Sequence, residues 1–193
     1  MDNVRVRFDS RFRLQLIPGL ALALVLLMTA PALSRSATNR DANPRALILM
    51  PTPFGQTVVR YALNLAEAKL DRPGCRDIYA QFVLQDGGTP QGVLDAMGIE
   101  PRSLLEHLVF MDGSHEAVCA AGRAGLTTSP GSFVIFVCPQ FTQLYVHNPP
   151  LAAILILHES LHVLGLAEDR PTSGTITDEV EWRCWENGNP KGR

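Results

Sequence analysis

Residues 158–162 read H-E-S-L-H, with two histidines four positions apart and a glutamate beside the first. On an α-helix, side chains four positions apart lie on one face, so His158 and His162 can bind a single tetrahedral zinc ion. Zinc lowers the pKa of a bound water molecule to near neutrality, and Glu159 can take its proton as hydroxide attacks a carbonyl carbon. These residues predict a zinc site with Glu159 as general base.

The segment that carries this motif is predicted to be a buried helix. Residues 151–164 contain no helix breaker, Asn148 precedes them as a candidate N-cap, and Gly165 follows where a C-terminal glycine is typical. Apart from the histidines, the glutamate and a serine, the segment is apolar. Two core histidines that are satisfied by hydrogen bonds are the alternative interpretation, because buried polar groups usually find such partners. We favour the metal site.

Residues 158–168 resemble the active-site signature of the zincin metallopeptidases. The likeness is closest to the extended form H-E-x-x-H-x-x-G-x-x-(His or Asp) of the metzincin and snapalysin-like branches, with Gly165 and Glu168 at the last two positions. In those families the glycine lets the chain turn sharply and bring the last residue back as the third zinc ligand. The resemblance implies a small zincin-like domain that hydrolyses peptide bonds, with Zn²⁺ held by the two histidines and Glu168.

Two features depart from those families. Glu168 stands where His or Asp is usual, although a carboxylate oxygen is an acceptable zinc donor. All five methionines precede the motif, so no methionine follows it to form the turn that lies beneath the metal in metzincins. We favour Glu168 as third ligand, and Asp169, Asp178 and Glu179 stay open as alternatives. Asp178 and Glu179 would correspond to zincins whose third carboxylate comes from a later helix.

The same resemblance implies further parts of the site. A strand ahead of the active-site helix borders the cleft in zincins and pairs with extended substrate, and residues 125–128 or 133–138 are candidates for it. A His, Tyr or Arg often stabilises the oxyanion, and Tyr145, His147 and Arg170 lie nearby in sequence. Other side chains considered for metal binding or pocket lining are His115, His147, Trp182 and Trp185.

The remaining elements must position this motif. Apolar spacing and turn residues predict helices over 57–70, 90–97, 101–107 and 151–164, a strand over 108–111, and a hairpin of 125–128 with 133–138. Residues 46–50 fit a strand or a helix start. Thr175 and Asp178 resemble the capping box of a last helix. The nearly continuous apolar run 133–137 predicts a strand buried on both faces, in an α+β domain with a short sheet packed against the active-site helix.

The four cysteines predict two disulfides. Four cysteines allow three connectivities, and we favour Cys119 with Cys138, which flank the predicted hairpin, and Cys75 with Cys184. Zinc knuckles need cysteines in C-x-x-C pairs, and no two cysteines here are closer than 19 positions.

Residues 1–34 resemble a secretory signal peptide, with four arginines before an apolar run and small residues that signal peptidases accept after it. An uncleaved membrane anchor over residues 14–33 is the alternative. Residues 35–45 are predicted to be a flexible mature N-terminus, and 46–193 the zincin-like metallohydrolase domain. We therefore expect a secreted or periplasmic protein without stable membrane association after signal cleavage.

Composition narrows the functional classes. The chain has 193 residues, 46% of them hydrophobic, which suits one globular domain and excludes a disordered or collagen-like protein. Its 17 basic and 19 acidic side chains leave no clustered positive charge for nucleic acid. A peptide or protein substrate is the expected partner. The alternatives are a zinc amidohydrolase acting on non-protein amides such as cell-wall material, and a non-catalytic binding module with a structural metal.

Overall fold

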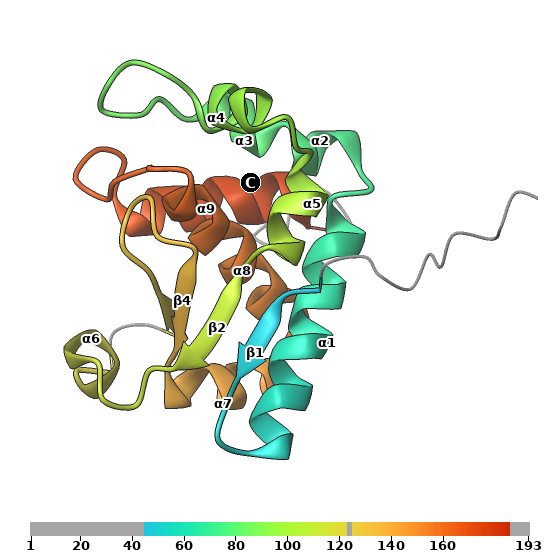
Figure 1. Ribbon diagram of the computed structural model, residues 1–193, viewed down its shortest axis with the longest axis vertical. Coiled ribbons are helices and arrows are strands. Elements are labelled where there is room, and N and C mark those ends of the chain that lie inside the picture. The colour runs from blue at the N-terminus through green and yellow to red at the C-terminus, as the bar shows by residue number, and fades with distance from the viewer. Residues whose placement is uncertain (1–44, 123–124, 186–193) are drawn as a thin grey trace, which may run out of the picture. The chain divides into compact units, whose positions relative to one another are not determined.

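The computed structural model describes residues 45–122 and 125–185 (Figure 1). The predicted signal peptide, 1–34, and all but the last residue of the predicted flexible segment, 35–45, lie outside the described residues. Within the described ranges, no helix is long and apolar enough to cross a membrane. The elements in chain order are β1 (Leu47–Leu49), α1 (Pro53–Lys69), α2 (Pro73–Arg76), α3 (Ile78–Gln81), α4 (Pro90–Met97), α5 (Pro101–Glu106), β2 (Val109–Asp112), α6 (Ala117–Ala120), β3 (Leu126–Thr127), β4 (Val134–Val137), α7 (Pro139–His147), α8 (Pro149–Val163) and α9 (Ser173–Cys184).

The strands form one sheet in the order β1-β2-β4-β3. Strands β1, β2 and β4 run parallel, whereas β3 runs antiparallel to β4 and lies at one end of the sheet. The predicted hairpin is therefore confirmed, with Leu126 opposite Val137 and Thr127 opposite Phe136. Residues 46–50, which the pattern left open between strand and helix, contain β1. The chain is an α+β protein with a small four-stranded sheet.

Helix α8 is the central element of the core. It packs against α1, α7 and α9, and it contacts β3. Figure 1 shows α1 and α8 on the side of the sheet that faces away from the viewer. Because neighbours surround α8, nearly every residue from 152 to 163 is buried, including the polar side chains at 158–160 and 162. The buried helix that the sequence predicts over residues 151–164 is thus present.

Helix α1 begins four residues before its predicted start at Thr57. Thr52 caps it, because the Oγ1 atom of Thr52 accepts the N–H of Gly55 at 3.0 Å, and Pro53 fills the first helical position, where a missing N–H costs nothing. The apolar spacing that predicted this helix starts only at Val58, so it could not detect the capping turn. Helices α4 and α5 and strand β2 lie within one residue of their predicted bounds.

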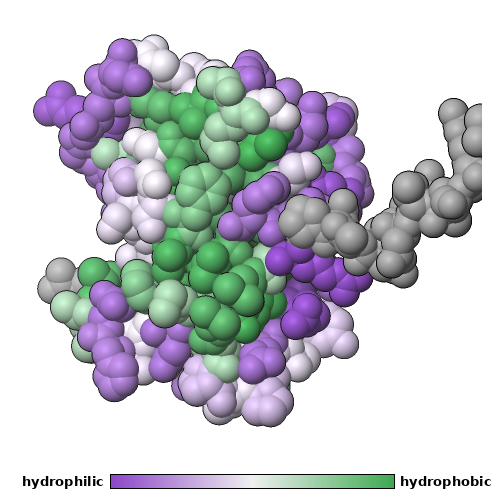
Figure 2. Space-filling model, viewed as in Figure 1, coloured by the Kyte–Doolittle hydropathy of each residue, from purple (hydrophilic) through white to green (hydrophobic). Residues whose placement is uncertain are grey.

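The prediction that β4 is buried on both faces is wrong. Ile135 and Val137 are buried, but Val134 and Phe136, which point to the other face, are only partly buried. On that face the neighbouring strands carry three exposed apolar side chains: Leu47, Leu49 and Met111. Figure 2 shows the hydrophobic surface that gathers over β1 and β2. The apolar run arises because one face packs on helices while the outer face is also apolar.

Both predicted disulfides are present. Cys75 of α2 is bonded to Cys184, the last residue of α9, across a sequence separation of 109. Cys119 of α6 is bonded to Cys138, which directly follows β4, across a separation of 19. This is the connectivity that the sequence interpretation favoured. Two disulfides are typical of proteins that fold in an oxidising, exported location.

Helix α9 begins earlier than predicted. Its N-cap is Thr172, whose Oγ1 atom accepts the N–H of Thr175 at 3.4 Å, so Thr175 and Asp178, the expected capping box, lie inside the helix instead. The predicted buried stripe of α9 is confirmed, and its members are Ile176, Val180 and Cys184. This stripe turns α9 toward the core.

Candidate metal centre

Local sequence fixes both ends of α8. At its start, the Oδ1 atom of Asn148 accepts the N–H of Leu151 at 3.2 Å, and prolines occupy the first two helical positions. At its end, Gly165 has φ +99°, a conformation that residues with a Cβ rarely adopt. The N–H of Gly165 donates to the carbonyl oxygen of His162 at 2.8 Å. The chain therefore turns sharply, directly after the second histidine.

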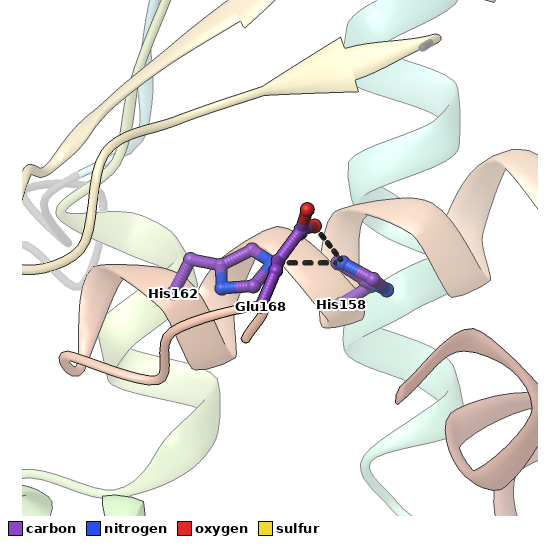
Figure 3. A group of neighbouring side chains, drawn as sticks. All are labelled: His158, His162 and Glu168. Atoms are coloured by element: carbon purple, nitrogen blue, oxygen red, sulfur yellow. Dashed lines mark hydrogen bonds and ion pairs between the residues drawn. The ribbon is translucent and has the colours of Figure 1, made fainter. Parts of the chain in front are cut away.

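This turn brings Glu168 back over the two histidines (Figure 3). The Nε2 atoms of His158 and His162 lie 2.8 Å apart. The Oε1 atom of Glu168 lies 3.1 Å from Nε2 of His162 and 3.5 Å from Nε2 of His158. Among residues 45–122 and 125–185, this is the group of His, Cys, Asp and Glu side chains that could hold a metal ion.

The three atoms suit a small divalent cation. Two nitrogen ligands of a tetrahedral zinc ion lie about 3.4 Å apart, so the imidazoles need to separate by roughly half an ångström to accept zinc. The carboxylate oxygen already lies near that spacing from both nitrogens. Two imidazoles and one carboxylate are a common ligand set for catalytic zinc. The donors therefore fit zinc, although they also suit other first-row divalent ions.

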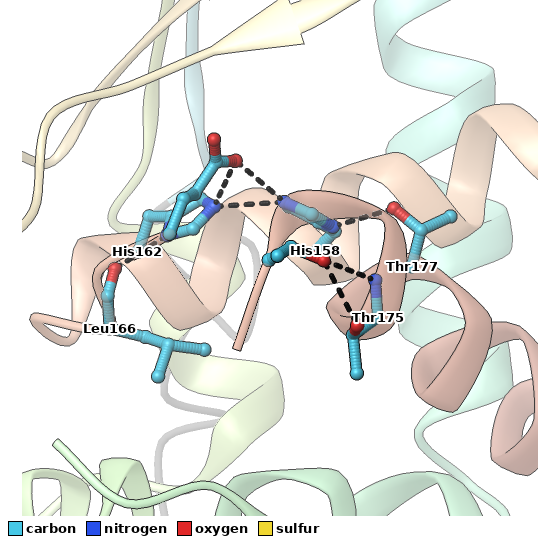
Figure 4. A network of polar contacts seen from close by, with 7 residues as sticks. His158, His162, Leu166, Thr175 and Thr177 are labelled. Atoms are coloured by element: carbon cyan, nitrogen blue, oxygen red, sulfur yellow. Dashed lines mark hydrogen bonds and ion pairs between the residues drawn. The ribbon is translucent and has the colours of Figure 1, made fainter. Parts of the chain in front are cut away.

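The other ring nitrogens have partners that orient the imidazoles (Figure 4). Nδ1 of His162 lies 2.6 Å from the carbonyl oxygen of Leu166, and Nδ1 of His158 lies 2.9 Å from Oγ1 of Thr177. A carbonyl oxygen only accepts, so Nδ1 of His162 carries the proton and its Nε2 presents a lone pair to the site. Metal-binding histidines in proteins usually have such partners.

Glu159 is buried beside the two histidines. Burial is the main cause that raises the pKa of its carboxyl group to about 8, and the negative charge of Glu168 acts in the same direction. A hydrogen bond from the backbone N–H of Thr128, which directly follows β3, acts against both. A divalent cation at the histidines would also favour the ionised carboxylate. A buried carboxyl group of this kind suits proton transfer at neutral pH.

Glu168 lies at the surface of the centre. Its side chain is 52% exposed, whereas the side chains of His158 and His162 are 2% and 4% exposed. Partial burial acts to raise its pKa, but a hydrogen bond with the side chain of Ser173 and attraction to the imidazoles outweigh burial and lower it. Glu168 is therefore a carboxylate at neutral pH. The centre contacts solvent on the side where Glu168 lies.

A second hydrogen-bond chain fixes the opposite side of α8. The Oγ atom of Ser160 lies 2.6 Å from the carbonyl oxygen of Leu157 and 2.8 Å from the hydroxyl oxygen of Tyr79. Because Ser160 donates to the carbonyl, the Tyr79 hydroxyl donates to Ser160. Tyr79 is fully buried, and burial raises the pKa of its phenol, so it stays a donor. This pair locks α8 to α3.

The alternative third ligands lie outside the metal-binding group. Asp169 accepts hydrogen bonds from the side chain of Gln85 and from the backbone of Arg170, and Glu179 pairs with Arg183 along α9. Asp178 also belongs to α9, and in the described chain neither it nor Glu179 joins the histidines. The structure thus brings together Glu168 and the histidines, as the favoured interpretation expected.

The remaining candidates differ in their surroundings. His115 is an exposed residue between β2 and α6, and neither it nor His147, the last residue of α7, joins the described metal group. Trp182 is exposed and lines an open hollow of about 330 Å³ on α9, whereas the ring of Trp185 lies 5.8 Å from the Lys69 ammonium group. The choice of an oxyanion stabiliser stays a prediction.

Sequence reasoning missed the residues that support the centre. Four residues outside the motif contact it, and they come from the residue after β3, from α9 and from α3: Thr128, Ser173, Thr177 and Tyr79. A hydroxyl side chain or a backbone amide can contact the motif from anywhere in the chain. No local sequence pattern indicates which of these groups will do so. The one signal was the expected capping box at Thr175 and Asp178, which predicted a helix start close to Glu168 although the capping residue is Thr172.

Comparison with protein-family models, curated proteins and solved structures finds no match to the chain.

Proposed function

We propose that this chain is an exported zinc metallopeptidase of the zincin type, which hydrolyses peptide bonds. The observation that carries the proposal is the convergence of three donors, from His158, His162 and Glu168, beside the buried carboxyl group of Glu159. Bound zinc would polarise a substrate carbonyl group and activate water. The imidazoles and the Glu168 carboxylate would hold the ion, and Glu159 would accept a proton from water and pass it to the leaving nitrogen.

Two features support a catalytic role for the metal over a structural one. A structural zinc ion is closed by four protein ligands, whereas a catalytic ion keeps one position for water or substrate. The described metal-binding group has three members. Its third member, Glu168, is 52% exposed, so solvent reaches this side of the group. The raised pKa of Glu159 also suits a group that exchanges protons.

Strand β3 supports a peptide as the substrate. It is an edge strand of the sheet and contacts α8. Thr128, the next residue, donates its backbone N–H to Glu159. An extended peptide can add to a sheet edge through backbone hydrogen bonds, and its scissile bond would then lie close to the base. The resemblance of residues 158–168 to zincins supports the same role for this strand.

The test combines metal analysis with hydrolysis of a mixed peptide library. Wild-type protein should bind one zinc ion per chain and cleave peptides, and a chelator should abolish cleavage. Glu159→Gln should keep the zinc and lose turnover by at least 100-fold, because removing a general base typically costs a factor of 10² to 10⁴. Glu67→Gln is the matched control, since Glu67 is a half-buried glutamate of α1 whose pKa is also raised by burial.

The outcomes separate the rival functions. Equal peptide cleavage by wild type and Glu159→Gln would remove Glu159 as the base. Zinc-loaded protein that is inert on every peptide but hydrolyses cell-wall amides would favour the amidohydrolase. Zinc-loaded protein inert on both would leave a binding module with a structural metal.

A further inference from the structure

Helix α9 contacts two of the three members of the metal-binding group. Oγ1 of Thr177 lies 2.9 Å from Nδ1 of His158, and the side chain of Ser173 forms a hydrogen bond with Glu168. Figure 4 shows Thr177 on the far side of the His158 ring from His162. The centre therefore depends on a helix that contributes no ligand.

The partners of the two histidines differ in chemistry. The carbonyl oxygen of Leu166 can only accept, so it allows a single tautomer of His162. The hydroxyl group of Thr177 can accept from Nδ1–H of His158 or donate to an unprotonated Nδ1, so it fits either tautomer. For His158 to present a lone pair on Nε2 to a cation, its neutral ring must carry the proton on Nδ1 and donate it to Thr177.

Helix α9 is held firmly at its other end. Cys184 is joined to Cys75 by the disulfide, and its carbonyl oxygen accepts hydrogen bonds from Lys69 at 3.1 Å and from Arg72. Arg72 also donates to the carbonyl oxygen of Trp185 at 2.8 Å. Positive charges at a helix C-terminus are favourable, because the helix dipole leaves partial negative charge there. Thr177 therefore approaches His158 from a helix whose position is fixed by covalent and polar contacts.

We infer that Thr177 is a positioning residue, which holds the His158 imidazole in the orientation and tautomer that bind the metal ion. The inference rests on the proposed metal centre and deepens it. It assigns the role to the hydroxyl group alone, because the methyl group of threonine cannot hydrogen-bond. Valine at this position would keep the shape of the side chain and lose the hydrogen bond to His158.

The experiment measures metal binding by four forms of the full chain, with zinc and with cobalt(II) as probes. Thr177→Val should lower zinc affinity by 10- to 100-fold, the usual effect of removing such a partner, and should change the cobalt d–d absorption spectrum. Thr177→Ser should restore both affinity and spectrum. Thr175→Val is the matched control, because Thr175 lies on the same helix. This variant loses a hydroxyl contact with Thr172, 3.0 Å long, that involves no candidate ligand.

The results distinguish this inference from the proposed function. Wild-type affinity and an unchanged cobalt spectrum in Thr177→Val would overturn the positioning role, and equal losses in Thr177→Val and Thr175→Val would reduce it to helix stability. If Thr177→Val does not fold, Thr177→Ala, which favours the helix, takes its place with the same expected loss. Wild type that binds neither probe would overturn both proposals, whereas metal binding that depends on Thr177 without peptide hydrolysis would overturn only the peptidase.

Discussion

The backbone N–H of Gly131 donates a hydrogen bond of 2.9 Å to the carbonyl oxygen of His162. The same oxygen accepts the N–H of Gly165 at 2.8 Å. The turn between β3 and β4 is thus attached to the end of α8 at a candidate ligand residue, and the helix end, the sheet edge and the return toward Glu168 meet at one atom. Substitutions in any of these segments should therefore alter metal binding at the candidate centre.

Gly165→Ala should destabilise the protein and weaken metal binding. A Cβ at this position would meet no atom within 4 Å, so the cost comes from the backbone conformation, φ +99°. Placing a residue with a Cβ in a left-handed conformation costs about 1–2 kcal/mol. Urea denaturation monitored by circular dichroism gives the stability, and zinc titration gives the affinity.

Gly174→Ala is the matched control for this change. Gly174 lies in the first turn of α9, has open space around its Cα and needs no positive φ. Alanine there should be neutral or stabilising by up to about 1 kcal/mol, because glycine is the weaker helix former. If both alanine variants had the same stability, the turn at Gly165 would not be under conformational constraint.

Loss of either candidate histidine should remove the metal. His158→Ala and His162→Ala each leave two donors of the group, so we expect zinc content to fall below about a tenth of an ion per chain after gel filtration, measured by atomic emission. His115→Ala, which removes an exposed histidine outside the group, should keep full zinc content. Full occupancy in either ligand variant would mean that zinc binds elsewhere.

The stability of the chelator-treated protein should decrease as pH falls from about 6.5 to about 4. Burial, and secondarily the charge of His162, lower the pKa of His158 to about 4 in the folded chain, whereas an unfolded histidine titrates near 6.5. Between these values the unfolded chain binds more protons, so acid favours unfolding. Denaturant titrations across this range test the slope, and His158→Gln should flatten it. An equal slope in both proteins would assign the effect to other groups.

The two disulfides should differ in their effect on the centre. Replacing Cys75 and Cys184 by alanine releases a closed loop of about 110 residues and frees the end of α9, so we expect a stability loss of about 4–5 kcal/mol and weaker zinc binding. Replacing Cys119 and Cys138 opens a much shorter loop, worth about 3 kcal/mol, and should leave zinc affinity unchanged. Chemical denaturation and zinc competition assays measure both quantities. Equal affinity losses would argue against a special role of α9.

The candidate ligands could be predicted from sequence because their signals are local. Asn148 and Gly165 mark the ends of α8, the histidines occur one helical turn apart, and Glu168 follows within a single turn of chain. All five lie in one short segment, in which helical spacing brings the histidines together and the turn at Gly165 returns the chain toward them. The disulfide pairing could be favoured for a similar reason, since Cys119 and Cys138 flank a hairpin.

Contacts between distant segments could not be predicted. Thr177 lies 19 positions from His158, and the sequence gives no reason to choose its hydroxyl group over those of other threonines. Helix α7 was not predicted, because its N-cap position holds Cys138, and cysteine is not a residue type that marks a helix start. The apolar run in β4 led to the wrong prediction of burial on both faces. Such a run shows that both faces of the strand are apolar, but not how many of them are covered by helices.

The late position of α9 in the chain has a consequence for how the centre matures. During synthesis, residues 158–168 emerge before Ser173, Thr177 and Cys184 do, so a nascent chain already has the three donors but lacks the helix that aligns them. Closure of the bond between the last residue of α9 and Cys75 then fastens that helix in place. At the proposed metal centre, tight binding of an ion would therefore be a late step of folding, because it would need α9 in place.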